Sequence, residues 1–206
     1  LNQILVGSIE KVYENLINIR HLFGIRKLPN RTFKPKISNS NSRWSNGLAA
    51  WDILHCKEEE MLRPTLKALN NLGLNCSFGI EEFYKIPRYT SLIGLIPFSS
   101  DKGEYYIDND DLKKMEGELN SAEIVREINL TDGNTTLNIN DMGLGVSQVL
   151  PIVVGAYDGA FNIMSVEQPE LHIHPAIQCK LADVLAHAVL GKKKADEKYL
   201  LLETHS

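Results

Sequence analysis

Apolar and polar positions recur with two different periods along the chain, and the change comes near residue 120. Before it, apolar residues return every three or four positions, which predicts amphipathic helices over residues 9–24 and 49–74. Pro64 is expected to break or kink the second helix, and Gly73 to end it. Residues 25–48 carry prolines, asparagines and basic residues, a composition typical of an irregular loop.

Beyond residue 120 the pattern is one of strands joined to helices. Residues 121–130 and 135–141 alternate with a period of two, and the TDGN between them predicts a hairpin. A helix is expected from a Ser147 cap, with Pro151 in its first turn. A buried strand over 161–167, a helix over 175–190 and the final KYLLLETHS strand follow. This strand–helix–strand order predicts an α/β layer.

Composition excludes several classes of protein. The 206 residues are 43% apolar, enough for a core, yet no stretch approaches the length of a membrane span and no basic leader precedes the first helix. Three cysteines without CxxC spacing exclude a disulfide scaffold and a cysteine zinc site. We therefore expect a cytoplasmic protein with no membrane partner.

The formal charge of −4 gives no overall reason to expect nucleic-acid binding, although a local basic patch would permit it. The basic loop offers two interpretations. It is either a solvated loop or a contact for phosphate or nucleic acid, and the candidate contacts are Arg26, Lys27, Arg31 and Lys34.

Two strand ends carry candidate chemistry. In a parallel sheet, ligands bind beyond the carboxyl ends of the strands, where Glu167 and His205 are expected. A carboxylate there could hold Mg²⁺ that bridges phosphate oxygens, and a histidine could hydrogen-bond a terminal phosphate or an attacking water. Taken singly, each also fits an ordinary solvated or structural strand end.

A third piece is the glycine pair before the apolar helix. Gly143, Gly145, Ser147 and Gln148 lie where glycines and the free N–H groups of a helix start could form an anion-binding pocket. An ordinary tight turn explains a lone GxG equally well. Specificity comes from the order of all three pieces.

GxGxSQ, then EQPELHIHP, then ETHS occur in one order over residues 141–206. This arrangement resembles the C-terminal half of an ABC-type ATPase head. It is most similar to bacterial AAA/ABC-like ATPases related to the overcoming-lysogenization-defect (OLD) and SMC-type proteins, in the subgroup that writes GxGxSQxLP and EQPExHxHP. Residues 17–48 resemble a further segment of that subgroup more loosely.

The resemblance implies roles for the EQPE residues. Glu167 stands at the Walker B carboxylate that supports Mg²⁺. Gln168 stands where most such heads have the glutamate that polarises the attacking water, and an amide can position water but cannot take its proton. Glu170 could substitute only if the backbone turned it inward. Slow hydrolysis, ATP binding as a clamp and efficient hydrolysis all stay open.

The resemblance also implies a head-to-head dimer with ATP between the subunits. The signature segment, Gly143–Gln148, would contact the nucleotide of the opposite subunit, with Gly145 in place of the usual serine. His205 matches the switch histidine, and His172 and His174 lie in the D-loop that crosses the interface. The His172-x-His174 spacing also permits a zinc reading, whereas His174-Pro175 more simply marks entry to a helix.

The expected fold class is α/β: the C-terminal lobe of a P-loop NTPase, ABC-type ATPase head, with a mixed sheet and flanking helices. Residues 1–120 would form a helical or irregular insertion, and residues 121–206 the lobe with the signature, Walker B and switch-histidine motifs. No GxxxxGK[ST] loop occurs in the sequence, so we expect it upstream of residue 1 and expect this lobe alone to be inactive.

The predicted function is Mg²⁺-dependent ATP hydrolysis that drives a partner or effector, a nuclease among the candidates, in phage defence or DNA transactions. The alternative is a nucleotide-sensing clamp or scaffold with little or no hydrolysis, which Gln168 favours. An interaction domain without a nucleotide role is favoured only if no phosphate loop precedes the chain.

Overall fold

A computed structural model describes residues 9–13, 16–30, 33–36, 40–56, 58–74, 77–87, 109–132, 135–138, 141, 144–190 and 198–205. The chain forms two compact units. One comprises Leu1–Ile80 with Ile128–Ser206, and the other comprises Glu81–Glu127. The sequence predicts a different division, at residue 120, between an insertion and the lobe that carries the motifs. That division stays a prediction.

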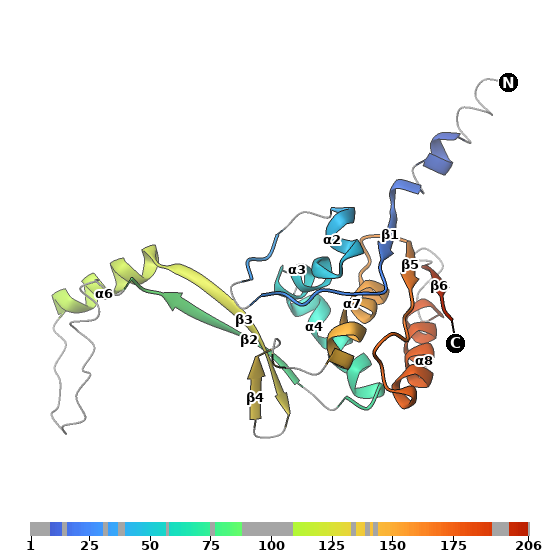
Figure 1. Ribbon diagram of the computed structural model, residues 1–206. Coiled ribbons are helices and arrows are strands. Elements are labelled where there is room, and N and C mark those ends of the chain that lie inside the picture. Colours follow the sequence, from blue (N-terminus) through green and yellow to red (C-terminus); the bar gives the residue numbers. More distant parts are fainter. Residues whose placement is uncertain are drawn as a thin grey trace. The chain divides into compact units, whose positions relative to one another are not determined.

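The first unit is built on a parallel sheet with the order β1-β5-β6 (Figure 1). Its strands are β1 (Ile19–Leu22), β5 (Ile163–Glu167) and β6 (Tyr199–Glu203). Register aligns Val166 with Leu22 on one side, and Glu167 with Glu203 on the other. The carboxyl ends of three strands therefore meet at one edge of the sheet.

The two predicted strands β5 and β6 are confirmed, but β1 was not predicted. Residues 9–13 and 16–17 are helical, but the expected helix over 9–24 is wrong in its second half, because residues 19–22 form a strand. The segment Ile19–Leu22 pairs instead with β5. A short apolar run does not reveal its partner, so tertiary pairing decided its conformation.

Helix α7 (Leu144–Tyr157) is the centre of the helical layer. It packs against β5 and against α3 (Leu48–Cys56), α4 (Glu58–Asn71) and α8 (Pro175–Leu190), while α2 (Asn41–Ser45) packs on β1 and α3. Residues 147–156 are all buried. A helix that is apolar on every side belongs in the interior of a domain, as α7 does.

Two contacts fasten α7 to the sheet. A Cβ atom on Gly155 would lie 2.5 Å from Met164 Cε and 3.2 Å from Trp44 Cζ3, so the helix approaches β5 closely only because residue 155 is glycine. At the other contact, the buried Lys198 ammonium donates to the carbonyls of Gly155 and Asp158 at the helix C-terminus. A cation is favourable there because the helix dipole is negative.

Two helix predictions need correction. The helix expected over 49–74 is two helices, and Pro64 lies inside α4 without ending it. Helix α7 begins at Leu144, so Ser147 is not its cap and Pro151 lies beyond its first turn.

Other helix predictions are confirmed. Gly73 follows α4 in the left-handed conformation, with φ of +85°, and its N–H donates to Asn70 O. Helix α8 spans Pro175–Leu190 as expected, with Pro175 at its first position.

A second sheet has the order β2-β3-β4, formed by Ser77–Lys85, Glu123–Asp132 and Thr135–Asn138. Strands β3 and β4 are antiparallel with Asp132 opposite Thr135, which confirms the hairpin at TDGN. Strand β4 belongs to the first unit, and the second unit contains α6 (Asn109–Ser121). Among the described residues, no helix is both long and apolar enough to span a bilayer.

The glycine between α2 and α3 gives a test of this packing. Gly47 has φ of +83°, and a Cβ atom there would lie 3.1 Å from Arg26 Cβ and 3.4 Å from Pro151 Cγ. Gly47→Ala should lower the free energy of unfolding by about 1–2 kcal/mol, because it adds left-handed strain and crowding. Chemical denaturation measures the change. Gly159→Ala, where nothing lies within 4 Å, should stay within about 0.5 kcal/mol of the native chain; equal losses in both variants would contradict the assignment.

Candidate functional site

The carboxylate of Glu167 lies at the end of β5 and is held by the end of β1. Its Oε1 is 2.9 Å from His21 Nε2, and its Oε2 accepts the Gly24 N–H at 3.4 Å. The side chain is about one-third exposed. Each oxygen keeps further acceptor capacity, so this half-buried carboxylate fits a ligand of Mg²⁺.

The next residue, Gln168, has a left-handed backbone with φ of 42°. Its N–H donates to Glu203 O at 2.8 Å, which ties the turn to β6. A Cβ atom on Gly24 would lie 2.9 Å from Gln168 Oε1, so the amide side chain rests directly on the backbone of Gly24. Left-handed conformations of residues other than glycine carry strain and cluster at functional sites.

The left-handed turn brings Glu170 to the end of β6. Leu171 N–H donates to Gln168 O at 3.1 Å, and Glu170 Oε1 accepts the His205 N–H at 3.1 Å. The turn therefore directs Glu170 to the backbone of His205, and a catalytic role for Glu170 stays a prediction. His205 itself is largely exposed, with Nε2 3.9 Å from Glu203 Oε1.

The pKa of the Glu170 carboxyl is lowered from its ordinary value of 4.5. Burial acts in the opposite direction and raises it, but it is outweighed by hydrogen bonds from the Glu170 and His205 backbone N–H groups and the Thr204 hydroxyl, and by the charge of His205. Glu170 is thus an ionised carboxylate at neutral pH, and it holds the backbone of the predicted switch histidine.

The signature segment lies against the same loop. Gly143 is outside the described residues; a Cβ atom on Gly145 would lie 3.8 Å from His172 O. Ser147 and Gln148 are only 1% and 4% exposed. The nucleotide contacts predicted for this segment stay predictions, and the structure shows what its glutamine binds within the subunit.

Both amide atoms of Gln148 bind the backbone of Arg26. Oε1 accepts the Arg26 N–H at 3.1 Å, and Nε2 donates to Arg26 O at 2.9 Å. The Arg26 guanidinium in turn donates through Nη2 to the carbonyls of Glu167, at 2.6 Å, and Gln168, at 3.2 Å. One arginine therefore joins helix α7 to the Gln168 turn.

Arg26 is 2% exposed, so the solvated-loop interpretation is wrong for this residue. Burial lowers the pKa of its guanidinium to about 10, while the nearby charges of Glu170 and Glu167 act to raise it. Arg26 is still cationic at neutral pH. Lys27 and Lys34 are exposed, and Arg31 lies outside the described residues.

His174 caps helix α8. Its Nδ1 accepts the Ala176 N–H at 3.2 Å, and its carbonyl accepts the Ile177 N–H at 2.8 Å. His172 is left-handed, with φ of 61°. Within the described ranges, no three His, Cys, Asp or Glu side chains are placed to hold a metal ion, so the zinc reading gains no ligand set.

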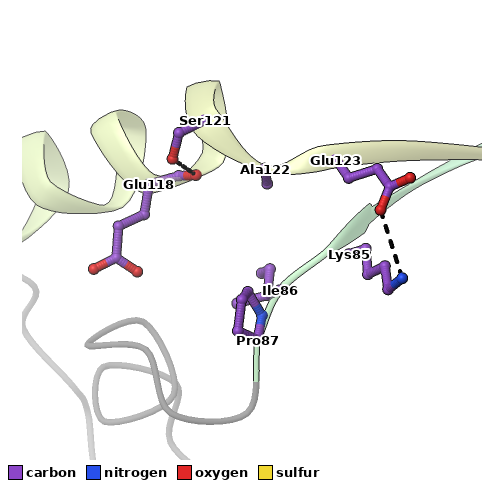
Figure 2. A pocket seen from close by; sticks show the side chains of 7 residues that line it. All are labelled: Lys85, Ile86, Pro87, Glu118, Ser121, Ala122 and Glu123. Carbon is purple, nitrogen blue, oxygen red and sulfur yellow. Dashed lines mark hydrogen bonds and ion pairs between the residues drawn. The ribbon is translucent and has the colours of Figure 1, made fainter.

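Two cavities bear on the placement of the site. One of about 190 Å³ lies beside the loop after β5 and is lined by Pro169, Glu170, Gln178, Leu181, Ala182, Leu185, Leu202 and Thr204. The other, of about 470 Å³, belongs to the second unit (Figure 2) and is lined by Lys85, Ile86, Pro87, Glu118, Ser121, Ala122 and Glu123. The second contains none of the motif residues.

Comparison with known families decides the class of protein. The family model described as AAA ATPase domain matches residues 24–206. The chain belongs to the AAA ATPase domain family. This AAA ATPase domain is therefore of the nucleotide-binding ATPase type, a type that usually uses Mg²⁺ with the nucleotide. Its α/β architecture agrees with the expected fold class, the P-loop NTPase head of ABC type.

Solved structures similar to this AAA ATPase domain include two SMC heads. One, an SMC head bound to the C-winged helix domain of ScpA, is 12% identical with a TM-score of 0.39. The other, an Smc head with an extended coiled coil bound to the C-terminal domain of ScpA derived from Pyrococcus furiosus, is 10% identical with a TM-score of 0.39. The matches cover 77% and 80% of this chain, and 42% and 33% of those chains. No curated protein matches the sequence.

The Glu170 contacts predict a pH dependence. A carboxyl whose pKa is lowered on folding contributes stability above its ordinary value of 4.5 and loses it as the pH falls through the lower folded value. Glu170→Gln should therefore reduce the difference in unfolding free energy between neutral pH and the acid side of 4.5. Denaturant titrations at several pH values measure this difference. Glu60→Gln on α4 is the control. An equal loss of unfolding free energy on acidification in the native protein and both variants would contradict the Glu170 assignment.

Proposed function

We propose that this AAA ATPase domain is the C-terminal lobe of an ATPase head that binds ATP with Mg²⁺ and hydrolyses it. The observation that carries the proposal is the meeting of Glu167, Gln168 and His205 at the ends of neighbouring parallel strands. Ligands of α/β proteins bind at such an edge. Membership of the AAA ATPase family supports nucleotide as the ligand.

Glu167 would hold Mg²⁺, which neutralises charge on the phosphate oxygens when bound. Gln168 would position the attacking water through its amide. It cannot accept the proton, and Glu170 is a weak base because its pKa is lowered. Slow hydrolysis follows from this set of residues. The exposed His205 would contact the terminal phosphate or the water.

The other half of the nucleotide site would join the open edge of β6. In the described part of the chain no strand pairs with that edge, and Tyr199, Leu201 and Leu202 are 45–56% exposed on β6. An unpaired edge with apolar side chains is typical of a site for strand addition. We propose that a parallel strand carrying the phosphate loop pairs there.

The productive state would be a head-to-head dimer in which Gly143–Gln148 contacts the nucleotide of the opposite subunit. The proximity of Gly145 to the His172 backbone supports this, because it places the signature segment beside the predicted D-loop. Closing of the dimer would drive a partner or effector, a nuclease among the candidates, in phage defence or DNA transactions.

A nucleotide-sensing clamp is the second candidate. The observation that favours it is Gln168, an amide held against Gly24 where most related heads have a carboxylate base. Such a protein would close on ATP and release it slowly without turnover.

Single-turnover ATP hydrolysis by the full-length native protein separates the two functions. Glu167→Gln should lower the rate at least about 100-fold, because the Mg²⁺ ligand is lost. Glu60→Gln removes the same charge from helix α4, which carries none of the motif residues, and should stay close to the native rate. Equal rates in Glu167→Gln and the native chain would contradict the proposed Walker B role.

Gln168→Glu then tests the clamp. If the native chain hydrolyses ATP, the substitution should raise the rate, because a carboxylate can take the proton. If the native chain only binds ATP and Gln168→Glu starts turnover, the clamp is correct and the hydrolase is not.

The dimer has its own test. In light scattering of the full-length native protein, a non-hydrolysable ATP analogue with Mg²⁺ should double the mass. Gly145→Asp should abolish the doubling by placing a charge at the interface, whereas Gly145→Ser should preserve it. A Cβ atom on residue 145 would meet His172 O at 3.8 Å, an ordinary van der Waals distance, so folding should survive. Doubling that persists with Gly145→Asp would contradict the interface.

A further inference from the structure

We propose that Arg26 is a positioning residue that fixes the Gln168 turn, and that Gln148 acts on hydrolysis through Arg26. The inference rests on the proposed function, since it names what holds the water-positioning residue. Neither Arg26 nor Gln148 need touch nucleotide or water to act in this way.

The first half of the connection is a two-point pairing. The Gln148 side chain binds both the N–H and the carbonyl of Arg26, and the two residues are 2% and 4% exposed. Two parallel hydrogen bonds fix orientation as well as distance. Because Gln148 lies in the second turn of α7, the backbone of Arg26 has to follow any movement of that helix.

The second half connects Arg26 to the turn. Its guanidinium donates to the carbonyls of Glu167 and Gln168, the two residues between which β5 ends. Gln168 is left-handed, and a residue with a side chain loses free energy in that conformation. Hydrogen bonds to the two carbonyls that flank the Gln168 Cα atom offset that loss and hold the Gln168 amide against Gly24.

Arg26 is also incompletely satisfied. Its Nε and Nη1 are buried without a hydrogen-bond partner in the described part of the chain. Buried donors without partners lower stability, so a packing role alone does not explain a guanidinium here. A residue that lowers stability while it shapes a strained turn is expected at a functional site.

A separate pair of hydrogen bonds stabilises the far end of the turn, and it supplies a matched control. Gln178 on α8 donates to the carbonyls of Glu170, at 3.3 Å, and Ile173, at 2.9 Å. Gln178→Met is chemically the same change as Gln148→Met. It loosens the other end of the same loop.

Hydrogen–deuterium exchange on the nucleotide-free, full-length protein tests the connection without any activity. The Gln168 N–H donates to Glu203 O on β6, and the Leu171 N–H donates to Gln168 O within the turn. Both should exchange at least about tenfold faster in Gln148→Met and Arg26→Met. In Gln178→Met, Ile173 should change more than Gln168. Arg43→Met controls for general destabilisation, because it breaks the ion pair with Asp52, which is far from the turn in the sequence. It should leave both turn amides at native exchange rates.

Native exchange at Gln168 and Leu171 in Gln148→Met would overturn the proposal, and so would equal acceleration in Arg43→Met. Gln148→Met decides the matter if Arg26→Met fails to fold, because it removes no charge.

A kinetic arm separates positioning from binding. Single-turnover hydrolysis should fall about tenfold or more in Gln148→Met while the ATP Kd stays within about threefold, and Arg26→Lys should recover part of the loss suffered by Arg26→Met. A loss confined to ATP affinity would overturn the positioning role. If the native chain binds ATP without turnover, hydrolysis as the proposed function fails, and the exchange experiment alone decides on Arg26.

Discussion

Parallel pairing of β5 with β1 on one side and β6 on the other is the constraint from which the site follows. The pairing places Glu167 beside Glu203, and it brings the β1 end close enough for His21 and Gly24 to bind the Glu167 carboxylate. In this register the carboxyl ends share one edge. A shift of one residue would turn each side chain to the opposite face of the sheet and separate the groups.

Two kinds of feature that lower stability meet at this edge. The core of the first unit is apolar packing centred on α7, with Trp44, Trp51 and Met164 fully buried. Beside the edge lie a buried guanidinium, a buried amide and two left-handed residues, Gln168 and His172. Burial of a polar group and a left-handed backbone each lower stability. These features come from three segments of the chain, which the fold brings together here.

The sequence predicted the structure best where the hydrophobic periodicity agrees with residues that mark the end of an element. Strand β5, helix α8 after Pro175 and the TDGN hairpin each have a clear period and a clear boundary residue. Strand β1 has neither, because four apolar and basic residues fit a helix equally well until β5 is beside them. Likewise the motifs named Glu167 and Gln168, while the sequence left Arg26 as either a solvated loop residue or a contact for phosphate or nucleic acid. Its role depends on Gln148, which lies 122 residues away, and no local pattern expresses such a contact.

The distance along the chain between His21 and Glu167, 146 residues, also has a kinetic meaning. During synthesis β1 emerges long before β5, so its backbone N–H and C=O groups lack a strand partner until β5 has been made. The hairpin of β3 and β4, by contrast, can close as soon as it is made. Contacts of such high sequence separation slow folding. The pairing of β1 with β5, which brings His21 to Glu167, should therefore be a late step in forming this protein.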